Sequence, residues 1–292
     1  MQPSRQPSSA NPTSAIVEGT PFTVGSGFTA DTYRAPHFNG LMDPLVMVDH
    51  YTMTTPTFGA HPHAGLSAVS ILFEESEGQF HNRDSQGNDL DLNPGDLYWL
   101  KAGCGAVHDE SPRAGSTIRG LQVFVNLPNQ QRHDAPESVL VRAESMPLIK
   151  NDGFRARLVL GTSNGKESAS APDRAMTIVD GYVKHNATFS HQRSDSESSW
   201  IIAIDGDIEL ALAEHTVRLK KGQAIAIGAS KSVPQQSICI TGRSIGEAHF
   251  VLFCGTPIQE DYIQEGPFIM GSKEEMKQAR ANFTAGKFGS IS

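Results

Sequence analysis

Short apolar runs alternate with turn-forming residues along the first half of the chain, and both recur at a regular spacing. Residues 69–73 and 97–100 are apolar runs of strand length. Between them lie the turn-forming segments Asp84-Ser85-Gln86-Gly87-Asn88 and Asn93-Pro94-Gly95-Asp96. This pattern is typical of antiparallel barrels and sandwiches, in which strands are short and connections are tight. We therefore predict an antiparallel β-barrel over about residues 58–127.

The second half of the chain repeats the pattern of the first half. Gly78 and Gly95 stand between two apolar runs, and Gly206 and Gly222 stand between two further apolar runs at a nearly constant offset in sequence. An offset that is kept over a whole hairpin indicates an internal repeat. The predicted fold class is therefore all-β, with two tandem antiparallel barrels of one kind.

Both ends of the chain depart from this pattern. Residues 1–15 are rich in Pro, Ser, Gln and Asn and lack the apolar core of a secretory signal, so we expect a disordered leader. Near the other end, Ser272 and Glu275 have the spacing of a capping box, and residues 276–283 continue a helical pattern. The predicted division is a leader over residues 1–15, a first barrel over 16–135, and a second barrel over 136–292 that includes this short C-terminal helix.

Two short motifs, His61-x-His63 and His108-x-Glu110, supply candidate metal ligands. Side chains at positions i and i+2 of a β-strand point to the same face, so each motif presents two ligating groups on one side. If the two strands face each other, three imidazoles and one carboxylate converge on one point. Such a set leaves two positions of an octahedral transition-metal ion open, which favours a reaction centre over a closed structural site.

The composition narrows the classes of function. The 292-residue chain has a net charge of -8 and no cluster of Lys and Arg, so direct nucleic-acid binding is not expected. No apolar run reaches the roughly 18 residues of a membrane span. Cys104, Cys239 and Cys254 form no CxxC pair and leave an odd thiol, which favours a reducing compartment, the cytoplasm or a eukaryotic nucleus. The chain has no Gly-x-Ser-x-Gly motif of a serine hydrolase and no dinucleotide-binding glycine motif after a strand.

The second barrel keeps at most one of the four candidate ligands. The offset of the glycine turns pairs His61 with Phe189, His63 with His191, His108 with Gln235 and Glu110 with Ser237. We therefore predict one barrel with a metal site and one structural barrel. His191 is interpreted as an ordinary polar residue, with a ligand role as the alternative.

Several longer segments of the chain resemble the pirin family, whose members are two-barrel proteins of the cupin superfamily. The resemblance extends from about residue 30 to the C-terminus. Its segments in the first half are Asp43-Pro44-Leu45, His61-Pro62-His63-x-Gly65, Arg83-Asp84-Ser85-x-Gly87-Asn88, Pro94-Gly95-Asp96-x-x-Trp99, Ala102-Gly103-x-Gly105-x-Val107-His108-x-Glu110 and Gly120-Leu121-Gln122-x-x-Val125-Asn126-Leu127-Pro128. Its segments in the second half are Gly255-x-Pro257-Ile258, Gly266-Pro267-Phe268-Ile269-Met270 and Ala285-Gly286-Lys287-Phe288-Gly289. Together these segments are specific to the family, whereas the glycine turns alone are not.

The resemblance implies two cupin-type barrels and a metal bound by His61, His63, His108 and Glu110. The metal is usually iron in this family, so Fe(II) is the expected cofactor, with Mn, Co, Ni, Cu and Zn as alternatives. Some members cleave flavonols such as quercetin with O2, and others are described as redox-responsive partners of transcription factors or metabolic enzymes. Two functions therefore stay open: a quercetin 2,3-dioxygenase-like enzyme acting on a small aromatic substrate, and a non-enzymatic iron-dependent redox sensor that binds a protein partner. Another cupin reaction, such as sugar isomerisation, is a further alternative.

If the protein is an enzyme, Glu110 is the candidate catalytic residue. A bound dication lowers the pKa of a flavonol hydroxyl, and Glu110 is the ionisable ligand that can accept its proton. The apolar neighbours of the motifs are interpreted first as barrel core, with an aromatic-binding pocket as the alternative. These neighbours are Phe58, Leu66, Trp99 and Phe124.

Three positions depart from the pattern of many relatives. Ala64 and Cys104 stand where an arginine is frequent, and His50 replaces an acidic residue after Asp49. We expect these changes to lie near the site and to affect the substrate more than the metal. Cys104 is interpreted as a small buried residue in a Gly-Cys-Gly turn, with a redox role as the alternative.

Overall fold

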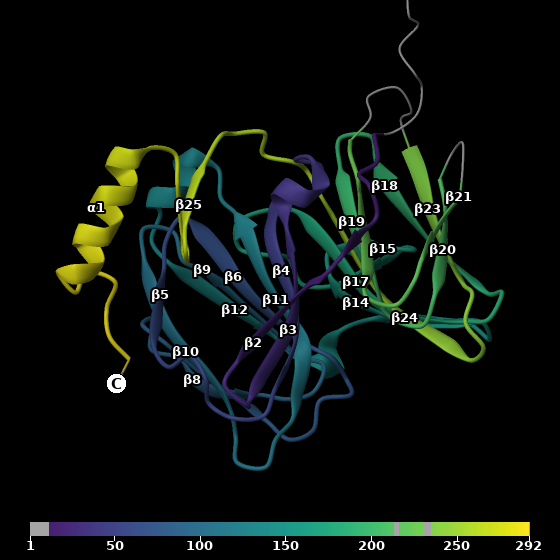
Figure 1. Ribbon diagram of the computed structural model, residues 1–292, viewed down its shortest axis with the longest axis horizontal. Helices are drawn as coiled ribbons and strands as arrows, with labels where there is room; N and C mark the ends of the chain where they lie inside the picture. Colours follow the sequence, from purple (N-terminus) through teal and green to yellow (C-terminus); the bar gives the residue numbers. More distant parts are fainter. Residues whose placement is uncertain (1–11, 213–215, 230–234, 292) are drawn as a thin grey trace, which may run out of the picture.

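The computed structural model describes residues 12–212, 216–229 and 235–291, which form two β-barrels side by side (Figure 1). Each barrel combines a seven-stranded and a four-stranded antiparallel sheet. The seven-stranded sheet of the first barrel contains, in spatial order, β12 (Glu137–Val141), β9 (Leu97–Lys101), β6 (Leu66–Leu72), β11 (Ile118–Asn126), β4 (Leu45–Met53), β3 (Phe28–Arg34) and β2 (Thr20–Val24). Its four-stranded sheet contains β5 (His61–His63), β10 (Ala106–Pro112), β7 (Phe80–Asp84) and β8 (Asp89–Leu92).

The second barrel has the same construction. Its seven-stranded sheet contains β1 (Val17–Glu18), β22 (Gln223–Ile227), β19 (Ser198–Asp205), β24 (Glu247–Gly255), β17 (Met176–Lys184), β14 (Phe154–Leu160) and β13 (Leu148–Lys150). Its four-stranded sheet contains β18 (Thr188–Ser194), β23 (Gln235–Gly242), β20 (Ile208–Ala211) and β21 (Thr216–Leu219). The remaining elements are the pairs β15 (Thr162–Ser163) with β16 (Lys166–Glu167) and β25 (Ile263–Glu265) with β26 (Phe268–Met270), the 3-10 turns Ala35–Phe38, Asn129–His133 and Ala143–Ser145, and helix α1 (Lys273–Thr284).

The internal repeat predicted from the glycine turns is present in the fold. The order β5-β10-β7-β8 in the first barrel corresponds to β18-β23-β20-β21 in the second. The φ angles of these four glycines are +84° at Gly78, +87° at Gly95, +68° at Gly206 and +76° at Gly222. Glycine adopts this left-handed conformation without strain. The predicted all-β fold with two tandem cupin-type barrels is therefore confirmed.

Strand β11 shows how the sequence distributes side chains over the two faces of one sheet. Leu121 and Val123 point toward the second barrel, whereas Gln122 and Phe124 line a cavity inside the first. Alternation along the strand produces this division, because successive side chains point to opposite faces. Every apolar residue of the strand is buried.

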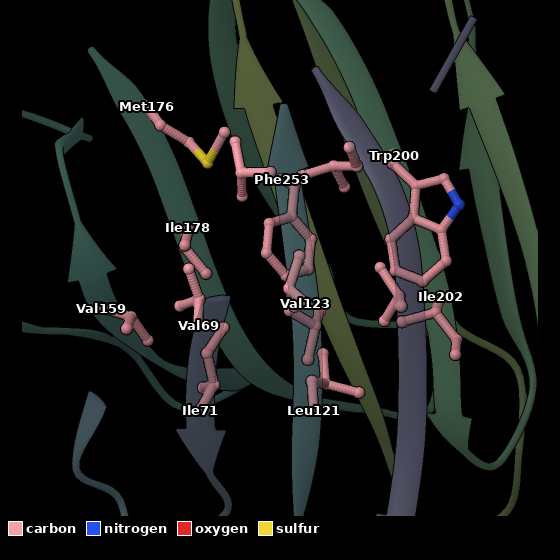
Figure 2. Packing of buried hydrophobic residues seen from close by; sticks show 14 of the residues in the cluster. Val69, Ile71, Leu121, Val123, Val159, Met176, Ile178, Trp200, Ile202 and Phe253 are labelled. Carbon is pink, nitrogen blue, oxygen red and sulfur yellow. The ribbon is translucent and has the colours of Figure 1, made fainter. Parts of the chain in front are cut away.

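The two barrels share one apolar core, which fills the space between their seven-stranded sheets (Figure 2). The first barrel contributes Val69, Ile71, Leu121 and Val123, and the second contributes Ile178, Trp200, Ile202 and Phe253. Trp200 is 1% exposed, and its ring lies 5.6 Å from that of Tyr33 and 5.8 Å from that of Phe253. Since each sheet covers the apolar face of the other, we expect the barrels to unfold together.

A buried ion pair adjoins this core. Asp180 of β17 accepts hydrogen bonds from Arg157 of β14 and from Nε2 of His249 of β24, the latter at 2.6 Å. Arg157 also donates a hydrogen bond, 2.6 Å long, to the carbonyl of Gly95, which lies in a turn of the first barrel. Arg157 and Asp180 are 2% and 1% exposed, so the pair joins the barrels in a site that excludes water.

The two ends of the chain cross between the barrels. Residues 12–18 run beside β22 of the second barrel, where Ser14 donates its N–H to the carbonyl of Ala226 at 2.9 Å, before β2 joins the first. At the other end, the β25–β26 hairpin docks on the first barrel, where Ile269 donates its N–H to the carbonyl of Ala64 at 2.9 Å. Figure 1 shows the hairpin and α1, in yellow, on the side of the first barrel that contains β5.

These contacts bear on the predicted boundaries. The leader expected over residues 1–15 lies outside the described residues up to residue 11, whereas residues 12–15 are placed against β22. The boundary near residue 135 stays a prediction. Helix α1 was expected to belong with the second barrel, but Met276 and Ala279 pack against Ala64 and Phe268 beside the first.

Helix α1 begins as its capping box predicts. The Ser272 side chain accepts a hydrogen bond from the N–H of Glu275 at 3.2 Å. Within the described part of the chain, no helix has both the length and the apolar character needed to cross a membrane.

Gly65 is the position at which docking of the hairpin is most sensitive to substitution. Its φ is +72°, and a Cβ there would lie 1.7 Å from the carbonyl oxygen of Ile269. Gly65→Ala is expected to displace the hairpin and to lower the free energy of unfolding by more than about 2 kcal/mol, because strain adds to the clash. Hydrogen exchange at the Ile269 amide would measure the displacement. The control is Gly87→Ala, whose φ is +90° with open space around the Cβ, so stability should fall by only about 1 kcal/mol and Ile269 should stay protected.

Candidate metal centre and pocket

Three histidines converge at one end of the first barrel. Strands β5 and β10 pair in antiparallel register, so that His108 lies opposite His61, and His63 follows two positions along β5. The Nε2 atom of His108 is 2.9 Å from Nε2 of His63 and 3.0 Å from Nε2 of His61. The structure thus brings together the three imidazoles that the sequence motifs predicted.

The protonation of these rings fits a metal. Burial lowers the pKa of His61 and His108, and it lowers the pKa of His63 to about 3, so all three rings are neutral at pH 7. The Nδ1 atom of His61 lies 2.8 Å from the carbonyl oxygen of Gly59, which holds the proton on that nitrogen and leaves the Nε2 lone pair free. Three neutral imidazoles whose Nε2 atoms converge form a donor set for a borderline transition-metal ion.

Glu110 lies beside the histidine cluster and outside it. Its Oε2 atom is 3.9 Å from Nδ1 of His108, and its Oε1 atom accepts hydrogen bonds from Ser70 at 2.5 Å and from Asn82 at 3.0 Å. Burial raises the pKa of Glu110 to about 7, against the opposing effect of the Ser70 hydrogen bond. The carboxyl group is therefore poised to exchange a proton near neutral pH, whereas its role as a fourth ligand stays a prediction.

A cavity of about 700 Å³ opens in front of the histidines. Its aromatic lining comprises Phe22, Phe28, Phe58, Phe80 and Phe124, and its polar lining includes Arg34, Asp49, Tyr51, Glu110 and Gln122. Gln264, Gly266 and Pro267 of the β25–β26 hairpin complete the wall. Cavities of this size with few polar groups are typical of small-molecule sites.

Comparison with known proteins places this fold and site in a family. The family model described as Pirin matches residues 14–125, and the model described as Pirin C-terminal cupin domain matches residues 178–289. The chain belongs to the pirin family. Human pirin is 29% identical over 249 residues, which cover 85% of this chain and 83% of that protein.

Solved structures of the same fold include an enzyme and a metal complex. Quercetin 2,3-dioxygenase from Acinetobacter baumannii is 20% identical, with a TM-score of 0.84 over 97% of this chain and 100% of that one. A bacterial pirin from Escherichia coli in complex with nickel(II) is 16% identical, with a TM-score of 0.62 over 83% of this chain and 99% of that one. At these identities the structural likeness establishes the pirin fold of the chain.

Of the four apolar residues interpreted first as barrel core, two line the cavity. Phe58 and Phe124 do so, but Leu66 is buried in the apolar cluster beside Phe124 and Trp99 lies in the core between the barrels. The first interpretation of Leu66 and Trp99 as core residues is therefore correct, whereas Phe58 and Phe124 fit the pocket alternative.

His50, which was expected near the site, does not line the cavity. Asp49 lines the cavity, so its successor on β4 points to the opposite face, where the ring of His50 is 5.8 Å from that of Phe73. Burial lowers the pKa of His50 to about 4, so it adds no charge to the space between the barrels at neutral pH. Ala64 is fully buried beneath the hairpin, and Arg34 of β3 is the arginine that lines this pirin-family pocket.

The expectation that Cys104 is buried was wrong. Its side chain is exposed, while the two flanking glycines are buried. A Cβ on Gly103 would lie 2.3 Å from the carbonyl of Asp134, and one on Gly105 would lie 2.1 Å from the ring of Phe288. Because the turn presents its glycines to these neighbours, the cysteine between them points to solvent.

The second barrel has an apolar interior at the corresponding place. Phe189 pairs with Ile240 where His61 pairs with His108, and both are fully buried. The register therefore puts Ile240, instead of Gln235, at the position of His108. His191 is buried and has its Nδ1 atom 2.9 Å from Oγ of Ser163, as expected of an ordinary polar residue.

Several residues of the cavity were not singled out from the sequence. Asp49 and Tyr51 stand two positions apart on β4, between Met47 and Met53, which also line the cavity, so the period of the strand was a usable signal that they share a face. No local signal could place Gln264 or Pro267 in the pocket, because they reach it only through docking of a distant hairpin.

Proposed function

We propose that this pirin-family protein is a metal-dependent dioxygenase that cleaves a flavonol such as quercetin with O2. The observation that supports it is the convergence of three neutral imidazoles at an aromatic-lined cavity of about 700 Å³, with Nε2 of His61 and of His63 each within 3.0 Å of Nε2 of His108. A cavity of this size accepts a flavonol, and the related fold of quercetin 2,3-dioxygenase from Acinetobacter baumannii is consistent with it. The proposed cofactor is Fe(II), with Mn, Co, Ni, Cu and Zn as alternatives.

We assign a different role to each group of residues at the site. His61, His63 and His108 would hold the metal, and Glu110 is the proposed fourth ligand. When bound, the metal supplies Lewis acidity and redox chemistry toward O2. Glu110 accepts the proton of the flavonol hydroxyl, because its pKa of about 7 suits a general base at neutral pH and Ser70 and Asn82 hold its carboxylate in place. The phenylalanines of the cavity exclude water from the ring that reacts.

The test is oxygen uptake and carbon monoxide release by protein loaded anaerobically with Fe(II), Mn(II), Co(II) or Ni(II) and then given quercetin and O2. We expect uptake of O2 in equal amount to the quercetin consumed, with matching release of carbon monoxide. Tight metal binding without turnover of any flavonol would contradict the proposal that the protein is a flavonol dioxygenase.

Such a result would favour an iron-dependent redox sensor that binds a protein partner. The observation in favour of this second function is the exposed Cys104, which stands in the turn that leads into the ligand strand β10. The three cysteines are all free thiols, which fits a reducing, cytoplasmic setting. Binding to a partner that changes between the Fe(II) and Fe(III) forms would establish the sensor.

A further inference from the structure

Two polar side chains on β4 face the cavity, and each has an atom with no hydrogen-bond partner among the described residues. Asp49 and Tyr51 stand at positions i and i+2 of the strand and both line the cavity. Tyr51 is 3% exposed, and within the described residues its hydroxyl has no hydrogen-bond partner. The Oδ1 atom of Asp49 is likewise buried and unpaired among those residues, while Thr32 across the β3–β4 pair bonds to the same carboxyl group.

Tyrosines inside this barrel differ in whether their hydroxyl has a partner among the described residues. Tyr98, another tyrosine of the barrel interior, donates its hydroxyl to Asp84. Burying a polar group without a partner is unfavourable, so groups left unpaired at a cavity wall are available to bond with a ligand that enters the cavity. The two groups differ in kind, since burial raises the pKa of Tyr51 and keeps its hydroxyl a donor, whereas a carboxylate accepts.

We propose that Asp49 and Tyr51 form a recognition subsite for a hydroxylated aromatic ligand, in which Asp49 accepts a hydrogen bond from a ligand hydroxyl and Tyr51 donates one to a ligand oxygen. Positions i and i+2 of a strand are about 7 Å apart, so the subsite matches two oxygen substituents on a flat ring system. Phe28, whose ring lies 5.8 Å from that of Tyr51 in a stacked arrangement, adds an apolar surface next to them. The inference rests on the proposed function in one respect, because it takes this cavity as the substrate pocket.

The test measures binding apart from turnover. Zinc-loaded protein would be titrated calorimetrically, without oxygen, with quercetin and with 3-hydroxyflavone, which keeps the metal-chelating oxygens and lacks the other hydroxyl groups. We expect quercetin to bind the wild type more tightly. Tyr51→Phe should weaken quercetin binding by about 5- to 10-fold, and Asp49→Ala by on the order of 10-fold or more, with 3-hydroxyflavone changed by less than about 2-fold.

Tyr51→Phe also separates recognition from folding. It removes a hydroxyl that no described residue binds, so the melting temperature should stay unchanged. The matched control is Tyr33→Phe. Tyr33 lies on the face of β3 that points away from the cavity, and its hydroxyl donates to the carbonyl of Gly222 at 2.7 Å. This variant should lose stability and keep the wild-type preference between the two ligands.

The outcomes distinguish this inference from the proposed function. Equal weakening of both ligands in Tyr51→Phe and Asp49→Ala would overturn the subsite, even if quercetin is turned over. A preference for quercetin that depends on both residues, without oxygen consumption, would support the subsite and contradict the dioxygenase. Failure of the wild type to bind either compound would overturn both.

Discussion

Replacing His63 with alanine is expected to abolish stoichiometric metal binding and, with it, any consumption of oxygen. The substitution removes one of the three converging imidazoles, whose Nε2 atom lies 2.9 Å from that of His108. Two neutral imidazoles and a neighbouring carboxylate bind a borderline dication far less tightly, so affinity should fall by more than about 100-fold. Competition with a graded chelator, followed by elemental analysis of the protein, measures the loss.

The second barrel offers a matched control for this experiment. His191 is a buried histidine at the position that corresponds to His63, and its Nδ1 atom is hydrogen-bonded to Ser163. His191→Ala should lower stability and leave the metal content unchanged. Equal metal content in the wild type and in His63→Ala would contradict the assignment of the site to the first barrel.

Replacing Asp180 with alanine is expected to lower the free energy of unfolding by about 3–5 kcal/mol. The loss arises because the guanidinium of Arg157, which is 2% exposed, would keep its charge in the interior without a counter-ion. His249 would lose its partner as well. Urea unfolding at neutral pH gives the change directly.

A surface pair in the same barrel provides the comparison. Asp205 lies 2.8 Å from Lys221, and both side chains are about two-thirds exposed, so Asp205→Ala should change stability by at most about 1 kcal/mol. Equal effects of the two substitutions would show that burial of the Asp180 pair contributes nothing.

The effect of Asp180 should also depend on pH. Burial alone would raise the pKa of the Asp180 carboxyl, but Arg157 and His249 outweigh it and hold the pKa well below its usual range. A carboxyl whose pKa is lowered in the folded state stabilises the fold above its unfolded pKa of about 3.9, and this contribution is lost as the pH falls further. The difference between wild type and Asp180→Ala should therefore be constant from pH 5 upward and shrink in acid, measured down to about pH 3.

The convergence of the three histidines could be predicted because its geometry depends on local periodicity. The i, i+2 spacing of His61 and His63 fixes their common face, and the antiparallel pairing of β5 with β10 then sets His108 opposite. The repeat and the helix were equally local, since they depended on glycine turns and on the cap at Ser272. Glu110 was correctly placed on the ligand face of β10, although its contact is with Nδ1 of His108 and its hydrogen bonds come from Ser70 and Asn82.

Properties that depend on which sheet face meets which partner could not be predicted. His50 was assigned to the wrong face, because the outer face of the seven-stranded sheet in the first barrel is as apolar as its inner face. The outer face is buried by the second barrel, and no single strand encodes that contact. The exposure of Cys104 had the same origin, since it follows from the packing of Gly103 against Asp134 and of Gly105 against Phe288.

The crossing of the chain ends sets an order of events during synthesis. The strands that present the histidines leave the ribosome early, but Gln264, Gly266 and Pro267 of the pocket wall follow the entire second barrel in sequence. Residues 12–18 can pair with their partner strand only after β22 has been synthesised, because β22 follows them by about 200 residues. A nascent first barrel thus has one open side until the second barrel has been made, because only then can the hairpin complete the cavity wall.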